Sequence, residues 1–435
     1  MVHVATVLLW NKIVGAVLWD ESRQYAIVEF DDSFIKRALD ISPVIMPLSE
    51  LQRGNNIFSF PSLSKETYYG LPGLLADSLP DRFGNRILNA WLTKQGRDLQ
   101  NINPVERLCY TGKRGMGALE YKPAMHPTGN YKSDPLEIDE LIYLANEILN
   151  ERTRLSGNLK DESEHSLIDI IKVGTSAGGA RAKAIIAYNE KTGEVRSGQS
   201  NAPENFSHWI IKFDGVKMKE LGDPRGYGRI EYTYYKMALE SGITMNECRL
   251  LEENDRAHFM TKRFDRINGN EKIHLQTLCA IAHFDYNDPN SYSYEQAFQV
   301  MRQLRLPYPD AEQLYRRMVF NVIAKNLDDH TKNISFLMDK TGKWKLAPAY
   351  DVTYAFNPES KWTRRHQLSI NAKRDEITKD DLLKVGKEMN IKKAKEIIEQ
   401  VKNIVADWST FAKSCGIPKS QIDEIARNQK VNIQI

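Results

Sequence analysis

Side chains that can bind a cation and handle a proton gather in one short segment, from Asp328 to Asn333. The segment reads Asp-Asp-His-Thr-Lys-Asn, and Asn333 stands five residues after Asp328. A carboxylate can accept or orient a proton, and carboxylate and amide oxygens bind Mg²⁺. Asp351, in the later sequence LAPAYD, supplies a second carboxylate for such a cation.

The spacing from Asp328 to Asn333 is typical of the protein-kinase catalytic loop. There, the Asp accepts or orients the substrate hydroxyl and the Asn binds Mg²⁺. Asp329 does not have this spacing. Asp351 follows a predicted hairpin, where a kinase carries its second metal-binding Asp, although the motif is not Asp-Phe-Gly. We interpret Asp328 as catalytic, and Asn333 and Asp351 as metal ligands.

Two other interpretations of this segment stay open. Asp328 to His330 could form a solvated turn whose aspartates cap a helix. The same residues could also serve a metal-dependent phosphohydrolase, although no second histidine stands at ligand spacing. In the kinase interpretation, we expect His330 and Lys332 to contact the nucleotide instead.

Lys212 ends the apolar sequence HWIIKF, which is typical of a strand. A buried lysine without a partner costs several kcal/mol, so its charge needs a carboxylate. Glu231 opens a predicted helix 19 residues later, as does the kinase glutamate that holds the phosphate-binding lysine. The alternative is a surface lysine and an unrelated exposed glutamate.

Small residues dominate the segment VGTSAGGARAK, from Val173 to Lys183, and predict a loop whose amides approach phosphate. Gly178 and Gly179 lie at its centre, and no Walker A lysine closes it. The earlier GKRGMG, residues 112–117, is interpreted as a structural turn between strands. In the predicted connection between lobes, residues 260–266, Phe264 could form an apolar wall for adenine or belong to the core.

The order of predicted elements indicates a two-lobed α+β fold, with a β-rich N-terminal lobe that carries an extra β subdomain, and a helical C-terminal lobe. Expected strands cover residues 4–9, 14–19, 25–30, 182–188, 208–213 and 258–264. Expected helices cover two short stretches within 70–98, then 137–155 and 229–241; after about residue 273 only one hairpin, 334–337 with 344–346, interrupts the helices. We predict domains at 1–125, 126–267 and 268–435.

Composition narrows the classes of partner. The 60 Lys and Arg against 57 Asp and Glu give a net charge of +3, too small to indicate nucleic acid as the main ligand. The four cysteines show no metal or disulfide spacing, and no stretch of about 18 apolar residues predicts a membrane span. Asn11 and Lys12 interrupt the apolar N-terminus, which therefore does not read as a signal peptide. We expect a cytoplasmic protein.

Taken in order, these motifs resemble the HipA family, the kinase components of bacterial toxin–antitoxin modules. The likeness is carried by LPGLLADSLPDRFGNRIL, GKRGMGALEY, TSAGGARAK, HWIIKFD, TKRFDR, NLDDHTKN and LAPAYD. It implies a kinase fold related to phosphoinositide and eukaryotic-like kinases, ATP and Mg²⁺ as cofactors, and Ser/Thr phosphorylation. It also implies a helix-turn-helix, HipB-like antitoxin that binds operator DNA, and a target such as an aminoacyl-tRNA synthetase.

The resemblance also assigns roles to single residues. Ser176 matches the serine that such kinases autophosphorylate, and Lys183 matches a lysine near the phosphates. Lys212 matches the phosphate-binding lysine, and Phe264 matches a residue that contacts the nucleotide. The remaining alternative is a kinase-fold pseudoenzyme that acts as a regulatory module with its antitoxin.

Overall fold

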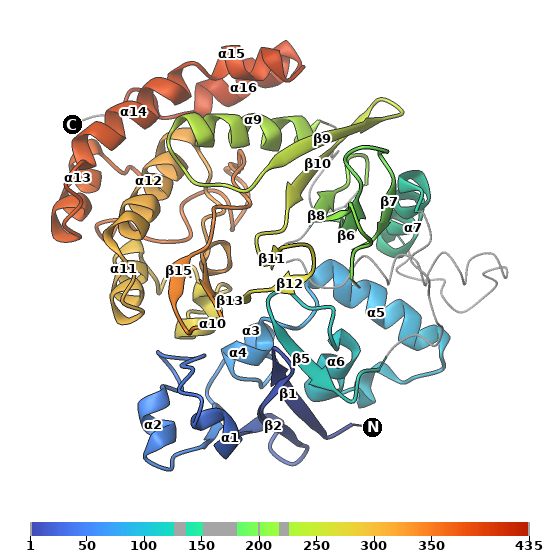
Figure 1. The fold of residues 1–435 in the computed structure, drawn as a ribbon. Helices are drawn as coiled ribbons and strands as arrows, with labels where there is room; N and C mark the ends of the chain where they lie inside the picture. Colours follow the sequence, from blue (N-terminus) through green and yellow to red (C-terminus); the bar gives the residue numbers. More distant parts are fainter. Residues whose placement is uncertain (1, 126–135, 151–180, 199–200, 217–225, 434–435) are drawn as a thin grey trace.

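The computed structural model describes residues 2–125, 136–150, 181–198, 201–216 and 226–433. The fold consists of three parts (Figure 1). An N-terminal sheet with short helices lies at the bottom of the view, a second sheet lies at the right below helix α9, and the remaining helices fill the left and top. This is the α+β, kinase-like architecture that the element order predicts.

The N-terminal sheet is antiparallel and has the strand order β4-β3-β2-β1-β5. Alternate residues of β2 and β3 are buried, as expected for a sheet with one face toward the core. Gly15 is required here, because a Cβ at this position would lie 1.9 Å from the Glu29 carbonyl oxygen. The strands are β1 (Val4–Leu9), β2 (Lys12–Asp20), β3 (Tyr25–Phe30), β4 (Ile57–Ser59) and β5 (Leu119–Lys122).

Short helices surround this sheet, and one of them reaches beyond it. Helix α5 packs its buried face, which includes Phe83 and Ile87, against helix α7 and the second sheet rather than the first. Asp81 caps its N-terminus, with Oδ1 accepting from Gly84 N at 2.6 Å. The helices are α1 (Asp32–Ile35), α2 (Leu48–Gln52), α3 (Lys65–Tyr68), α4 (Gly73–Ala76), α5 (Arg82–Lys94), a 3-10 turn (Leu99–Asn101), α6 (Pro104–Thr111) and α7 (Ile138–Asn150).

The second sheet is also antiparallel, in the order β7-β6-β8-β10-β9. Helix α9 packs on β9 and β10 at short distance, since a Cβ on Gly228 would lie 2.0 Å from the Ala257 carbonyl oxygen. This close approach brings the buried face of α9 over the sheet. The elements are β6 (Lys183–Tyr188), β7 (Val195–Ser197), β8 (Ser207–Lys212), α9 (Tyr227–Glu240), β9 (Cys248–Glu253) and β10 (Arg256–Lys262).

The C-terminal part is helical around α12, most of whose residues are buried. Its small sheet has the order β13-β14-β15. The helices are α10 (Leu278–Ala282), α11 (Tyr294–Gln303), α12 (Tyr308–Ala324), α13 (Lys379–Glu388), α14 (Ala394–Ala406), α15 (Trp408–Ser414) and α16 (Lys419–Asn428). The strands are β11 (Arg266–Ile267), β12 (Glu271–Lys272), β13 (His274–Thr277), β14 (Ser335–Met338) and β15 (Trp344–Leu346).

Most predicted elements are present, with two corrections. The hairpin of β14 and β15 has a third strand, β13, in a stretch predicted as helical. The GKRGMG turn joins helix α6 to strand β5, so it does not lie between strands as predicted. Among the described residues, no helix combines the length and apolar character that a membrane crossing needs. The predicted domain boundaries stay predictions.

Candidate active site

The predicted catalytic loop begins where α12 ends. Lys325 closes the helix in the left-handed conformation, with φ 60°, and a 3-10 turn at Thr331–Asn333 follows. The Asn333 side chain folds back over the loop, and its Nδ2 donates to the Asp328 carbonyl oxygen at 2.7 Å. The Asp328 side chain is 46% exposed, and its Oδ1 lies 3.9 Å from Nε2 of His330. The loop thus fastens Asn333 and leaves the Asp328 carboxylate open to a substrate.

Asp329, by contrast, is a buried anchor for the loop. The Tyr294 hydroxyl donates to its Oδ2 at 3.0 Å, and His366 Nδ1 lies 2.7 Å from the same oxygen. Gln367 N donates to its Oδ1 at 2.8 Å. Burial opposes ionisation, but His366 lowers the pKa of Asp329 below its ordinary value. With both oxygens occupied, Asp329 holds the loop in place, which supports Asp328 as the residue that meets the substrate.

Lys212 contacts Glu231, the partner that the kinase interpretation assigns to it, and also Asp351, which was predicted as a metal ligand. Its Nζ lies 2.5 Å from Glu231 Oε1 of helix α9 and also contacts Asp351 Oδ1. Although burial opposes the charge, Asp351 and Glu231 raise the pKa of Lys212 above its ordinary value. The lysine therefore stays charged between Glu231 and Asp351. Lys212 and Asp351 are 139 residues apart in the sequence.

Asp351 reaches Lys212 through an unusual backbone conformation. Its φ is 52°, in the left-handed region, which aspartate adopts more readily than most residues. Burial opposes ionisation, but Lys212 and Lys183 lower the pKa of Asp351 to about 2. Asp351 and Asn333 line the same pocket in the helical part of the fold. The two predicted metal ligands therefore converge, and the carboxylate is ionised at neutral pH.

The donor atoms at this point fit Mg²⁺. Because Asn333 Nδ2 is engaged with the loop, its Oδ1 is the atom left for a ligand, beside the Asp351 carboxylate. Mg²⁺ is commonly held by one or two such oxygens together with water and substrate phosphates. Within the described ranges, no group of three or more His, Cys, Asp or Glu gathers as a metal site would.

Asp81 is a site residue that the sequence did not reveal. Its Oδ2 lies 3.9 Å from Nζ of Lys183 on strand β6, and both side chains are buried. Lys183 pairs with Lys212 across strands β6 and β8, so Asp81 faces the lysines of the site from the end of helix α5. Burial raises the pKa of Asp81 to about 6. Among the described residues, no hydrogen bond reaches its Oδ2. Its only signal in the sequence is that of a helix cap.

His330 and Lys332 both lie against Tyr286 rather than free in solvent. The Lys332 Nζ stands 4.4 Å from the centre of the Tyr286 ring, and the His330 ring centre lies 5.7 Å from it. Burial opposes the charge, but the surrounding Cys279, Tyr286 and Asp77 raise the pKa of Lys332. These contacts place a charged lysine in the catalytic loop. A nucleotide contact for either residue stays a prediction.

Phe264 lies in the predicted position between the two lobes. It is half-buried, its ring centre is 5.6 Å from that of Tyr350, and it packs on a small apolar cluster that includes Leu337 and Ala347. Tyr350 directly precedes Asp351. Phe264 is therefore near Asp351 and partly exposed, as an adenine wall would be, and its role toward the nucleotide stays a prediction.

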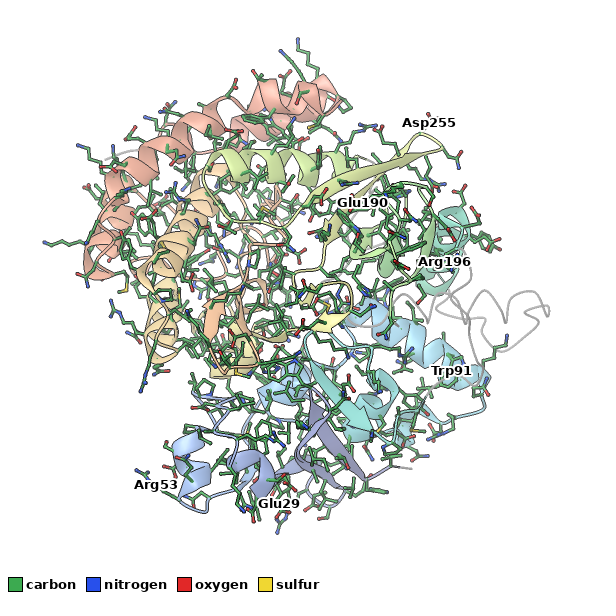
Figure 2. All side chains as sticks on the ribbon, in the orientation of Figure 1. Glu29, Arg53, Trp91, Glu190, Arg196 and Asp255 are labelled. Carbon is green, nitrogen blue, oxygen red and sulfur yellow. The ribbon has the colours of Figure 1, made fainter. Side chains whose placement is uncertain are left out.

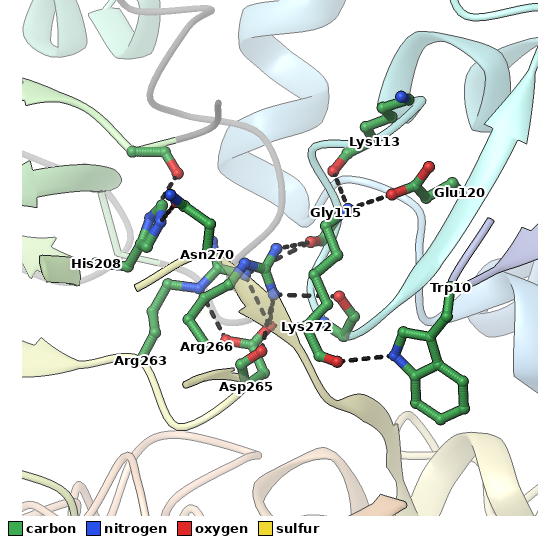
Figure 3. Close-up of polar contacts among 12 residues, drawn as sticks. Trp10, Lys113, Gly115, Glu120, His208, Arg263, Asp265, Arg266, Asn270 and Lys272 are labelled. Carbon is green, nitrogen blue, oxygen red and sulfur yellow. Dashed lines mark hydrogen bonds and ion pairs between the residues drawn. The ribbon is translucent and has the colours of Figure 1, made fainter. Parts of the chain in front are cut away.

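The residues after Phe264 are fastened to the N-terminal part by a buried charge cluster (Figure 3). Asp265 accepts from Arg263 Nε at 2.9 Å and Arg266 Nη1 at 2.8 Å. It also accepts from the Gly117 amide at 2.7 Å, and Arg266 Nη2 donates to the Gly115 carbonyl at 3.2 Å. These charges keep the pKa of Asp265 well below its ordinary value, against the effect of burial. The connection between the lobes, residues 260–266, is called the linker below. The GKRGMG turn thus acts as a clamp on the linker.

The outer side of the linker is held more loosely. Lys262 Nζ lies 3.3 Å from Glu190 and 3.5 Å from Glu247, and Arg249 lies 2.8 Å from Glu190. All four side chains are partly exposed, and Figure 2 labels Glu190 near the second sheet. Exposed ion pairs contribute little to stability, so the buried cluster around Asp265 is the stronger restraint.

The structure thus brings together Lys183, Lys212, Glu231 and Asp351, and it connects Asp328 with His330 and Asn333. Phe264 lies against Tyr350, which precedes Asp351, and Lys332 lies against Tyr286. Ser176, Gly178 and Gly179 lie outside the described residues. Catalytic, nucleotide and metal roles for all of these residues stay predictions.

Comparison with known proteins identifies the family. The model of the HipA N-terminal domain matches residues 5–122, and that of the HipA-like C-terminal domain matches residues 175–430, more than half of the chain. The chain belongs to the HipA family. Its fold is similar to a chain in the solved complex of HipA, HipB and operator DNA from Shewanella oneidensis MR-1, with a TM-score of 0.67. The identity is 15%, over 98% of this chain and 95% of that one.

Two other similar proteins match a smaller share of the chain. The Sinorhizobium fredii protein Y4mE, whose name describes it as a kinase, is 24% identical over 192 residues, which is 42% of this chain. The match spans only 39% of that relative's length. The Helicobacter pylori proinflammatory kinase CtkA reaches a TM-score of 0.30 at 16% identity, over 52% of this chain and 91% of that one, too low to support an argument. The likeness in fold therefore rests on the Shewanella structure.

Proposed function

We propose that this HipA-family protein is an ATP- and Mg²⁺-dependent Ser/Thr protein kinase, the toxin of a toxin–antitoxin module. One observation carries the proposal: the buried Lys212 ammonium lies between Glu231 and Asp351. Kinases pair their phosphate-binding lysine with a helix glutamate and place a metal-binding aspartate beside it. The open carboxylate of Asp328 and the amide of Asn333 complete this set.

In this proposal, each residue has a defined task. Lys212 and Lys183 balance the negative charge of the nucleotide phosphates, and Glu231 keeps Lys212 oriented. Asn333 and Asp351 would hold Mg²⁺, which supplies positive charge to the transferred phosphoryl group. Asp328 orients the attacking hydroxyl and receives its proton. Since phosphoryl transfer depends mainly on positioning and electrostatics, this small set is sufficient.

The same proposal includes the partners that the family resemblance implies. They are a HipB-like helix-turn-helix antitoxin, operator DNA bound mainly through that antitoxin, and a translation protein such as an aminoacyl-tRNA synthetase as the target. The relative from Shewanella was solved with HipB and operator DNA, which supports the antitoxin. We further propose that phosphorylation of Ser176 adds up to about two negative charges near the nucleotide and turns the enzyme off. Mass spectrometry that finds Ser176 fully modified in active enzyme would contradict this.

The deciding experiment follows labelled phosphate from ATP to protein, with autophosphorylation as a readout that needs no known target. We expect Asp328→Gln to abolish labelling while ATP still binds. Asp255→Asn is the matched control, because Asp255 is exposed on the turn between β9 and β10, away from the site. ATP binding without transfer by the wild type would instead indicate a pseudoenzyme. Free phosphate without labelled protein would indicate a phosphohydrolase.

A further inference from the structure

A second pocket, here called the basic pocket, lies between the segment that follows Asp351 and the loop after α10. Counted to its open mouth, it has a volume of about 670 Å³. Four cationic side chains line it: Lys361, Arg364, Arg365 and Arg374. No described Asp or Glu belongs to its lining. The pocket therefore concentrates positive charge in a chain that is otherwise nearly balanced.

Three of these cations are available to a ligand. Lys361, Arg364 and Arg365 are exposed, and none of them has an ion pair with a described residue. The Lys361 Nζ rests 4.5 Å above the Trp362 ring, which leaves its charge at the pocket. Like charges held close together repel, so an anion that enters the pocket relieves this repulsion.

The fourth cation, Arg374, belongs to the wall of the pocket. It is half-buried, and its Nη1 donates to the His366 carbonyl at 3.3 Å. Burial lowers its pKa, and Asp329 and Asp288 oppose that effect. Asp288 is not among the residues that line the pocket, and its carboxylate accepts from Ser291 Oγ at 2.5 Å and Asn290 N at 3.3 Å. The wall thus keeps a positive charge that faces an opening.

The basic pocket is attached directly to the catalytic loop. His366 and Gln367, which line it, are the residues that hold Asp329. Asp329 is the next residue after Asp328, and neighbouring Cα atoms are about 3.8 Å apart. Adding one side chain and one hydrogen bond places the pocket wall about 10 Å from Asp328. An extended peptide covers that distance in about three residues.

We infer that the basic pocket binds acidic side chains of the protein substrate, two to four positions from the serine or threonine that is phosphorylated. This inference rests on the proposed function and adds a substrate class to it. Carboxylates suit the exposed guanidinium groups, since Arg forms bidentate hydrogen bonds with them. The anchoring of the wall to Asp329 keeps the acidic position and the accepting hydroxyl in register.

A peptide fits these observations better than a nucleic acid. Proteins that bind nucleic acid spread their positive charge along a face, and they usually carry a large net charge. Here the formal net charge is +3, and the four cations are confined to one pocket. The pocket is also linked to the candidate site, because His366 and Gln367 in its wall hold Asp329, the residue next to Asp328.

The test uses the full chain and synthetic serine peptides that differ only in one position, which is Asp or Ala at each of four places on either side of the serine. For wild type, we expect Asp at a position two to four residues away to raise kcat/KM about tenfold or more, the effect of one charged hydrogen-bonded pair. Arg364→Ala with Arg365→Ala should remove that preference. Arg364→Glu with Arg365→Glu should reverse it, so that Lys peptides are preferred.

The control is Lys393→Ala with Lys395→Ala, an equal loss of exposed charge at the start of helix α14. These changes should leave the preference intact. If wild type transfers no phosphate to itself or to any peptide, the proposed function fails. If it labels itself or peptides but shows no acidic preference, or if the preference survives in the Arg364/Arg365 variants, only the inference about the basic pocket fails. Loss of binding to a labelled RNA in those variants, with peptide preference unchanged, would reassign the pocket to nucleic acid.

Discussion

Two buried charge clusters, one around Lys212 and one around Asp265, are built in different ways. Both oxygens of Asp265 accept hydrogen bonds, from Arg263, Arg266 and the Gly117 amide, and only Nη1 of Arg263 lacks a partner among the described residues. The site cluster is less complete. Asp351 offers Lys212 only one oxygen, and no described hydrogen bond reaches Oδ2 of Asp81.

The difference separates holding from binding. The Asp265 cluster has no carboxylate oxygen left for a ligand, and it holds the linker rigidly to the N-terminal part. A cluster with spare oxygens and ammonium groups can exchange its internal contacts for phosphates and a metal ion. The spare polar atoms of the site cluster are consistent with the proposed nucleotide site, since functional sites often leave such atoms unsatisfied.

The largest expected effect comes from breaking the site cluster at Asp351, the proposed metal ligand. Asp351→Asn should lower phosphate transfer by about a thousandfold, because a metal ligand contributes several kcal/mol to transition-state stabilisation. Stability should change little, since Lys212 keeps its 2.5 Å pair with Glu231. Labelling by ATP and the Tm would be measured together, with Asp255→Asn as control. A folded variant with near-normal transfer would remove Asp351 from the site.

Breaking the linker cluster should have the opposite result. Asp265→Asn leaves Arg263 and Arg266 buried without their counter-charge, which costs about 3–4 kcal/mol of unfolding free energy in comparable cases. Urea unfolding would measure the loss. At low temperature, where the variant is folded, ATP binding should remain, because Asp265 touches no residue of the site cluster. An unchanged urea midpoint would show that the Asp265 cluster does not stabilise the fold.

Lowering the pH should reveal the cost of keeping the buried Asp81 carboxylate charged. Its native pKa is about 6, above the ordinary 3.8, so the folded state takes up this proton before the unfolded state does. The free energy of unfolding therefore gains about 2–3 kcal/mol as the pH falls from about 6 to about 4, and loses it as the pH rises again. The difference between wild type and Asp81→Asn should show this pH dependence. A constant difference across that window would contradict the raised pKa.

The smallest expected effect concerns nucleotide affinity. Asp81 opposes the loss of charge that burial imposes on Lys183, whose pKa is lowered. Asp81→Asn keeps the helix cap on Gly84, because asparagine caps as well as aspartate. We expect the KM for ATP to rise about tenfold with kcat nearly unchanged, the effect of weakening one charged contact to the phosphates. A fall in kcat at constant KM would point to a different role.

Much of the fold could be predicted from the sequence, because local patterns coincide with the final burial. The alternating strands β1 and β3 and the helix α9 have nearly the predicted bounds. Strand β13 was missed because its four residues, HLQT, have neither alternation nor length, and it forms only by pairing with β14. Long-range pairing of this kind has no local signature.

The residues of the candidate site also fall into two groups, those that the sequence predicted and those that it did not. The Asp328 to Asn333 spacing and Lys212 stand in motifs, so they could be found in the sequence. Asp81 and the clamp function of GKRGMG could not, because their contacts join residues about a hundred or more positions apart. The Gly117 amide donates to Asp265 across 148 residues of sequence, and neither segment carries a local signal of this contact. Only the packing of α5 and the turn on their neighbours creates these contacts.

Gly117 also sets a rule for building chimaeras between members of the family. Its φ is 73°, and a Cβ there would lie 3.0 Å from Leu275 N, so the amide that caps Asp265 can be offered only by glycine. Halves taken from two homologues will fit at this seam if the donor half keeps that glycine and the recipient half keeps the aspartate. One backbone amide is thus a requirement that the two halves must share, beside the Arg266 and Lys272 contacts across the same seam.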